Sequence, residues 1–115
     1  MSSQKVTARH NMAKHEDMRE ALDVLKTLNH PVRLSILCNL IEKEEMSAGE
    51  IFEQEKDQAS QSQVSQYLKW LRDKNYVESR KEGQFVYYKI ASPEIRALIE
   101  KMHELFCDDK NFCSS

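Results

Sequence analysis

The 115-residue sequence predicts a mainly α (α+β) fold of five helices and one β-hairpin, and three observations carry this prediction. Apolar residues recur with helical spacing over most of the chain from residue 16 onward. One segment, residues 76–90, departs from this period and is rich in β-branched and aromatic residues. Only two glycines and two prolines interrupt the chain, so helices should dominate. A chain of this length fits one domain.

The first predicted helix begins near Glu16 and ends at Leu28. Its apolar residues form a single stripe: Met18, Ala21, Leu22, Leu25 and Leu28. Such a stripe is typical of a helix that buries one face, so we expect these side chains to be buried. The preceding residues 1–15 are polar, and we expect them to form a flexible N-terminal arm.

The second predicted helix covers residues 31–43, and a proline at its first position suits a helix start. Leu34, Leu37 and Ile41 lie on one face of this helix. Cys38 lies on that face with them. Because a buried cysteine usually serves as a small hydrophobic residue, this pattern alone leaves Cys38 as either a core residue or a functional thiol.

A short third helix and a longer fourth helix follow. Ser47 can cap the third helix, and Glu50 three residues later completes a capping box. Residues 53–60 have the composition of a polar turn. The fourth helix begins near residues 60–62 and ends at residues 74–75. Its buried residues are expected to be Val64, either Tyr67 or Leu68, and Leu71.

A hairpin and a last helix complete the order. Residues 76–80 and 85–90 predict two strands, because both runs are rich in strand-forming residues and a short loop with a glycine separates them. Ser92 caps the last helix, and a proline follows it. The apolar face of this helix is broad: Ile95, Leu98, Ile99, Met102, Leu105 and Phe106. Residues 108–115 form a polar tail.

A short helix, a turn, a helix with a polar face and a hairpin, in this order, make a winged helix-turn-helix. We therefore assign residues 16–107 to one winged-helix domain between the arm and the tail. The first and last helices flank this module, and their apolar faces are wide for so small a core. They either pack only on their own chain or form a two-fold homodimer interface, which is the commonest assembly and the one that we expect.

The outer face of the fourth helix predicts contact with double-stranded DNA. Its side chains are polar and mostly uncharged: Gln61, Ser62, Gln63, Ser65, Gln66 and Lys69. Glutamine can bond both edge atoms of adenine in the major groove, and serine can reach bases or phosphates. A face presented only to water would more often carry Glu and Lys, which form helices better than Ser does. The alternative is a solvated face rich in Ser and Gln.

The charge distribution supports a local polyanion-binding face. Residues 58–91 carry a net charge of +3, whereas the whole chain has a net charge of −2. At the tip of the predicted hairpin, Arg80, Lys81 and Gln84 lie near Gly83. In a winged helix this tip lies against the DNA backbone or minor groove, so we expect positioning contacts there. A solvated surface could carry the same modest asymmetry.

Three segments resemble the ArsR/SmtB family of bacterial repressors: HPVRLSIL (30–37), SQVSQYLKWLR (62–72) and RKEGQFVYYKI (80–90). The resemblance covers residues 16–107. It implies a homodimer that binds an imperfect inverted repeat in operator DNA and releases it when a signal arrives, with half-sites about 34 Å apart. One departure is the segment 53–61, which is longer than the family's usual link into the recognition helix.

The resemblance also concerns the signal. The runs LSILCNL (34–40) and HELFC (103–107) resemble the thiol-sensing branch of the family, the HlyU- and BigR-like proteins. This implies that Cys38 and Cys107 are a redox-sensing pair that responds to sulfane sulfur or oxidants. One thiolate attacks the signal, and the second thiol closes a disulfide or polysulfide bridge. Cys113 has no counterpart in that pattern.

The metal sites common in the family do not match this chain, so we predict no metal. A thiol pair on the third helix would lie in residues 46–54, which contain no cysteine and no histidine. A site on the last helix would begin with Asp and His, where this chain has Ser92 and Glu94. The alternative is a zinc-type sensor. Its four ligands would be drawn from His103, Cys107, Asp108, Cys113 and Cys38.

Other classes of function are disfavoured. We expect no enzyme and no cofactor, because the sequence has no Gly-rich phosphate loop, nucleophile elbow or CxxC motif. No run of about 18 apolar residues predicts a membrane span. The first residues lack the apolar middle of an export signal, and three cysteines do not suggest a disulfide framework. We therefore expect a cytoplasmic protein.

Overall fold

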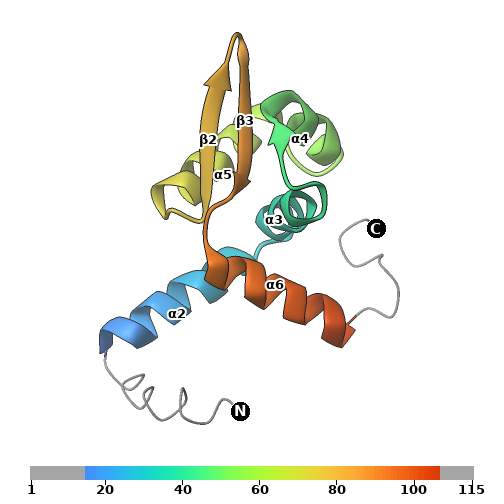
Figure 1. The fold of residues 1–115 in the computed structure, drawn as a ribbon. Helices are drawn as coiled ribbons and strands as arrows, with labels where there is room; N and C mark the ends of the chain where they lie inside the picture. Colours follow the sequence, from blue (N-terminus) through green and yellow to red (C-terminus); the bar gives the residue numbers. More distant parts are fainter. Residues whose placement is uncertain (1–14, 107–115) are drawn as a thin grey trace.

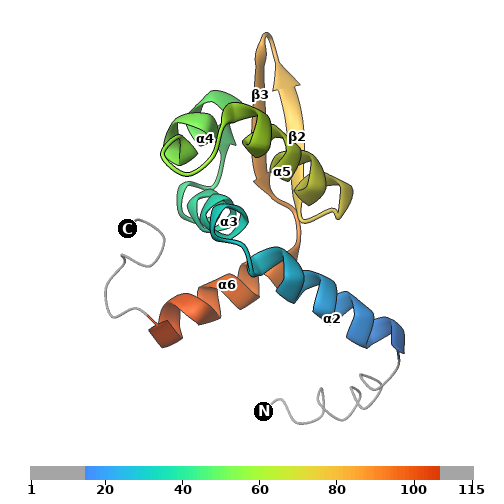
Figure 2. The same ribbon diagram turned by 180° about the vertical axis from the view of Figure 1, so that it is seen from behind.

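The computed structural model describes residues 15–106, which form five helices and a three-stranded sheet. The elements are α2 (His15–Leu28), α3 (Pro31–Lys43), β1 (Met46–Ser47), α4 (Ala48–Glu55), α5 (Gln61–Asp73), β2 (Val77–Glu82), β3 (Phe85–Ile90) and α6 (Pro93–Phe106). The β2–β3 hairpin extends from one end of the molecule, and α2 and α6 diverge at the opposite end (Figures 1 and 2). The predicted winged-helix fold is therefore confirmed.

The core is built around α3, which is buried on most of its surface. Six of its residues are buried: Val32, Ile36, Leu37, Cys38, Asn39 and Leu40. The helix packs against α2, α4 and β3. A helix that is apolar on most sides is expected at the centre of a fold. Leu34 and Ile41, predicted to share the buried face, are only half-buried.

The sheet has one strand that the sequence did not predict. Its strand order is β1–β3–β2, and all pairs are antiparallel. The hairpin pairs Glu82 with Phe85, which leaves a two-residue loop. Gly83 has φ +64°, as at the first central position of a type II′ turn, where a residue with a Cβ would be strained. The added strand β1 is only two residues long, so it carries no alternating pattern.

The predicted helix caps are confirmed. The Oγ of Ser47 accepts from the backbone N–H of Glu50 at 3.1 Å, and the Glu50 carboxylate accepts from the N–H of Ser47 at 2.8 Å. At the start of α6, the Oγ of Ser92 accepts from the N–H of Ile95 at 3.1 Å. These bonds satisfy N–H groups that a helix start leaves without a partner.

Most of the apolar stripe of α2 is exposed in the single chain, so the alternative in which this stripe packs only on its own chain is wrong. Leu28 is buried, but Leu22 is 61% exposed, and Met18 and Leu25 are also exposed. The reason is geometric, because α2 leaves the body of the protein and only its C-terminal part, from Val24 on, reaches the core (Figure 1). None of the helices within residues 15–106 is long and apolar enough to cross a membrane.

The last helix divides in the same way. Ile95 and Ile99 are fully buried, whereas Phe106 is 71% exposed and Leu105 is also exposed. The first half of α6 therefore covers the core, and its end extends beyond it. Residues 1–14 and 107–115 lie outside the described part of the chain. The predicted tail falls there, as does the predicted arm except for His15, which is the first residue of α2.

A buried carboxylate lies where the sequence predicted a polar turn. Glu55 is the last residue of α4, and it is only 2% exposed. The Oγ of Ser35 donates to its Oε2 at 2.7 Å, and the side-chain amide of Asn39 donates to the backbone oxygen of Ser35 at 2.8 Å. Burial raises the pKa of Glu55, and the hydrogen bond from Ser35 partly opposes that rise. The turn expected at residues 53–60 therefore begins with a core residue.

The raised pKa of Glu55 predicts a pH-dependent stability. The protein tolerates the buried Glu55 carboxyl better when it is neutral than when it is ionised. The stability that comes from the neutral form is fully present below the unfolded pKa of about 4.3 and is lost as the pH rises through the higher folded pKa. Glu55→Gln should therefore raise the free energy of unfolding at pH 8 by on the order of 1 kcal/mol, with little effect at pH 3.5. Urea denaturation at one protein concentration measures this. The exposed Glu53→Gln is the control, and a loss of stability for Glu55→Gln at both pH values would contradict the account.

Candidate nucleic-acid interface and thiol site

One face of α5 gathers the residues that the sequence predicted to contact DNA. Val64, Leu68 and Leu71 are buried against the rest of the chain. The opposite side presents exposed polar residues: Gln61, Ser62, Gln63, Ser65, Gln66 and Lys69. All six predicted residues therefore lie together on the surface of one helix, beside the hairpin (Figure 2). A helix with a free polar face of this kind has the dimensions to enter a DNA major groove.

Gln63 also has a structural role that the sequence reasoning missed. The N-cap Ser60 accepts from the backbone N–H of Gln63 at 3.1 Å, and the amide oxygen of Gln63 accepts from the backbone N–H of Ser60 at 2.9 Å. This is a second capping box, and the spacing S-x-x-Q was the available signal. A bidentate contact with adenine uses both amide atoms, so the capping bond to the amide oxygen restricts how Gln63 can present its side chain to a base.

The charged residues of α5 are only loosely held. Lys69 pairs with Asp73 at 3.1 Å, and both side chains are mostly exposed. Such a pair on a helix surface contributes little to stability, so Lys69 can leave it at small cost. Arg72 donates to the Oγ of Ser79 at 3.4 Å, which links the end of α5 to β2.

A buried polar junction joins α2 to α5. The indole N–H of Trp70 donates to Oγ1 of Thr27 at 3.2 Å, and this fully buried hydroxyl donates in turn to the backbone oxygen of Asp23 at 2.9 Å. Lys74 pairs with Asp23 at 3.1 Å. The Arg33 guanidinium lies 4.9 Å from the centre of the Trp70 ring. The sequence reasoning missed this junction, although an indole N–H that is partly buried needs an acceptor.

The wing residues divide into two groups. Lys81 and Gln84 are exposed near the turn, as predicted, and Lys81 makes no ion pair within residues 15–106. Arg80 instead pairs with Glu45 at 3.0 Å and with Glu82, and its guanidinium lies over the ring of Tyr87. The hydrogen bond from Arg80 lowers the pKa of Glu45, and the Glu45 carboxylate raises the pKa of Arg80.

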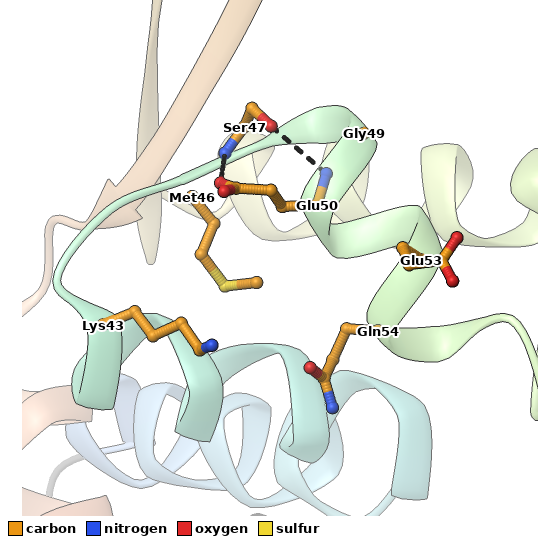
Figure 3. A pocket seen from close by; sticks show the side chains of 7 residues that line it. All are labelled: Lys43, Met46, Ser47, Gly49, Glu50, Glu53 and Gln54. Atoms are coloured by element: carbon orange, nitrogen blue, oxygen red, sulfur yellow. Dashed lines mark hydrogen bonds between the residues drawn. The ribbon is translucent and has the colours of Figure 1, made fainter.

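A shallow hollow of about 610 Å³ lies beside α4, on the side of β1 and the end of α3 (Figure 3). Its lining is of mixed charge: Lys43, Met46, Ser47, Gly49, Glu50, Glu53 and Gln54. Ser47 and Glu50 are already occupied by the capping box of α4. We therefore assign no ligand to this hollow.

Cys38 lies in the core, with 1% of its surface exposed. It belongs to the same hydrophobic cluster as Ile95 and Ile99 of α6, and Met102 packs against that cluster. Cys107 directly follows the last residue of α6 but lies outside the described residues, together with Asp108 and Cys113. The separation of the two predicted sensing thiols is therefore not part of the described geometry. His103 is half-buried on α6, and no group of three or more metal-ligating residues lies within 15–106.

Comparison with known proteins identifies similar chains. Residues 30–79 match the family described as bacterial regulatory protein, arsR family. The chain is 42% identical to the transcriptional activator HlyU of Vibrio cholerae over 88 residues, which cover 76% of this chain and 79% of that one. It is 35% identical to the biofilm growth-associated repressor of Xylella fastidiosa over 96 residues, 80% and 82% of the two chains. The solved structure of the repressor BigR from Xylella fastidiosa has a TM-score of 0.71 and 31% identity, and covers 95% of this chain and all of that chain.

The exposed face of α5 predicts a specific loss on substitution of Ser65. Ser65→Ala should weaken binding to a preferred duplex roughly tenfold and leave binding to random DNA and the melting temperature unchanged, because Ser65 has no cap role. Gln63→Ala should in addition destabilise the fold by about 0.5–1 kcal/mol, because the backbone N–H of Ser60 loses its side-chain acceptor while Ser60 still caps the helix. Fluorescence anisotropy on both duplexes and thermal unfolding measure these effects. Equal losses on both duplexes would assign Ser65 to phosphate contact instead.

The Thr27–Trp70 bond predicts a matched pair of variants. Thr27→Val keeps the shape but removes the acceptor, so it should lower the free energy of unfolding by about 1–2 kcal/mol. Thr27→Ser keeps the hydroxyl and should retain the bond. Trp70 is the sole tryptophan, so its fluorescence reports on this junction directly. An unchanged emission spectrum and stability in Thr27→Val would show that the bond contributes nothing.

Proposed function

The chain belongs to the ArsR family of bacterial regulatory proteins, in its HlyU- and BigR-like branch, and from this premise we propose a DNA-binding regulator whose release from DNA is controlled by Cys38 and Cys107. Its transcriptional role and its winged-helix DNA-binding fold follow from the family. The signal, the dimer and the residue roles below are our proposal. The observation that carries it is the burial of Cys38 in the core on which α6 packs, with Cys107 following α6 directly in the sequence.

The DNA contacts are proposed from exposure and polarity. In the proposed complex with DNA, α5 lies in the major groove, and its exposed residues bind base edges or phosphates. The contributing side chains are Gln61, Ser62, Ser65, Gln66 and Lys69, with Gln63 at the helix start. Lys81 and Gln84 contact the DNA backbone from the wing, which extends from the body of the molecule on the side away from α2 and α6 (Figure 1). Since the DNA of a bacterium lies in its cytoplasm, we propose a cytoplasmic location.

The proposed assembly is a two-fold homodimer through α2 and α6. The exposed apolar residues of both helices support it: Met18, Leu22, Leu25, Leu105 and Phe106. Removing such side chains from water stabilises a protein by roughly 25 cal/mol per Å² of apolar area. A monomer with these side chains exposed lacks this stabilisation, and a dimer that covers them gains it. In the proposed dimer, the two copies of α5 would face successive turns of one DNA duplex, about 34 Å apart.

The proposed sensing chemistry joins the two thiols. With peroxide, the Cys107 thiolate takes up one oxygen atom to form a sulfenic acid, and condensation with the Cys38 thiol forms the disulfide and releases water. With a persulfide donor, the Cys107 thiolate accepts the sulfane sulfur and releases the donor thiol. Cys38 then attacks the Cys107 sulfur and expels hydrosulfide. We assign the first step to Cys107 because Cys38 is buried.

The bridge would act by tying α6 to α3. These helices belong to different functional parts, since α3 lies under the helix-turn-helix and the end of α6 extends to the proposed dimer interface. A bridge between them would change the angle of α6 against the core and thus the separation of the two α5 helices. A thousandfold fall in DNA affinity requires a difference of about 4 kcal/mol between the two states.

Single cysteine variants test the switch. Cys38→Ser and Cys107→Ser should each bind DNA as the reduced wild type does, but should no longer be released by peroxide or by a sulfane-sulfur donor. Cys113→Ser is the matched control and should respond as the wild type does. Anisotropy before and after treatment measures release, and mass spectrometry of the two cysteine peptides identifies the bridge.

Two outcomes would oppose this function. Release that persists in both single variants would remove the thiol pair from the mechanism. Release by zinc in the presence of a reductant, lost on His103→Ala, would favour the zinc-type sensor with ligands from His103 and Cys107.

A further inference from the structure

Arg80 is held within the wing by contacts on three sides. Its Nε and Nη2 donate to the two carboxylate oxygens of Glu45, at 3.1 and 3.0 Å, and its Nη1 donates to Glu82. The guanidinium carbon lies 4.7 Å from the centre of the Tyr87 ring. A guanidinium has five N–H groups in a fixed fork, and this fork is already occupied by one carboxylate. Three of the five N–H groups of Arg80 therefore bind carboxylates and hold the guanidinium in place, and one N–H on each Nη remains.

The pair with Glu45 crosses the whole sheet. Arg80 lies opposite Tyr87 in the β2–β3 ladder, and Tyr87 in turn pairs with Ser47 of β1. The Arg80 side chain thus reaches from β2 over β3 to Glu45, the residue that precedes β1. Ser47 ends β1 and caps α4, the first helix of the helix-turn-helix. The Arg80–Glu45 pair therefore joins the wing to the start of the DNA-binding helices.

The local charge also disfavours a phosphate contact at this point. Two carboxylates surround one guanidinium, so the cluster of Arg80, Glu45 and Glu82 is net negative. Lys81 is exposed and lies outside these pairs. Surface ion pairs usually contribute little, but bidentate geometry within a network is the exception.

We propose that Arg80 is a positioning residue for DNA binding, which sets the angle between the wing and the helix-turn-helix through Glu45 and leaves phosphate contact to Lys81 and Gln84. This inference rests on the DNA binding of the proposed function and is independent of the thiol pair. It changes the role predicted from the sequence, which was direct contact between Arg80 and DNA.

A double-mutant cycle on the full, reduced chain tests the proposal. The probe is a fluorescein-labelled duplex that the wild-type protein enriches from a random-sequence library. Arg80→Gln and Glu45→Ala should each weaken binding roughly five- to twentyfold, and the double variant should be no weaker than the weaker single variant, because both remove one interaction. Glu78→Ala is the control. Glu78 lies on β2, as Arg80 does, but its carboxylate pairs with Lys89 at 3.5 Å and not with Arg80.

The salt dependence separates positioning from contact. We expect the slope of log K for DNA binding against log salt concentration to keep its wild-type value in Arg80→Gln, because no phosphate contact is lost. In Lys81→Gln the magnitude of this negative slope should fall by about 1. Arg80→Lys should bind as weakly as Arg80→Gln, because an ammonium group cannot hold the carboxylate fork. Melting temperatures verify folding, and faster hydrogen exchange at β1 and β3 amides should accompany each loss.

Direct contact would give the opposite results. Arg80→Gln would then lower the slope by about 1, Arg80→Lys would retain most of the affinity, and Glu45→Ala would strengthen binding more than Glu78→Ala does. Any of these results would overturn the proposal and leave DNA binding intact. A wild-type chain that enriches no duplex would overturn the DNA-binding premise itself, and hydrogen exchange would still show whether Arg80 holds β1 against β3.

Discussion

The burial of α3 on most of its surface is the constraint on which the rest of this structure depends. The helix contacts α2, α4 and β3. It therefore positions three parts of the molecule relative to one another: α2, which we propose for the dimer interface, the helix-turn-helix, and the sheet. Its buried positions leave room for few changes, because protein interiors are close-packed. Cys38 is one of these positions, and a thiol there is joined mechanically to every element that packs on α3.

Two buried polar contacts specify how helices meet around this core. Glu55 meets Ser35 where α4 joins α3, and Trp70 meets Thr27 where α5 joins α2. Hydrogen bonds inside an apolar core have strict geometry, since an unpaired buried group is destabilising. Apolar packing tolerates small shifts of one helix past another, whereas these bonds do not. Movement of α2 would therefore be passed to α5, the helix with the candidate DNA-binding face.

The surface residues show why residue type is an incomplete guide to role. Gln63 and Arg80 are the kinds of side chain that recognise bases and phosphates, and both lie close to the candidate interface. In the fold, however, the amide oxygen of Gln63 caps α5 and the guanidinium of Arg80 binds Glu45. Ser65, Gln66 and Lys81 remain exposed for contact with DNA. The proposed interface thus combines exposed residues that are free to contact DNA with residues that fix the shape of that surface.

The sequence by itself determined the order of the helices, the hairpin, the two predicted caps and the exposed face of α5, because these depend on spacing and on contacts within a few residues. Only the tertiary structure decided that β1 joins the sheet, that Glu55 is buried, that α2 leaves its apolar stripe exposed, and that Arg80 binds Glu45 across 35 residues of sequence. The physical reason is that burial and ion pairing depend on which distant segment lies opposite a side chain. A periodic pattern shows that a face is apolar, but it does not show what covers that face.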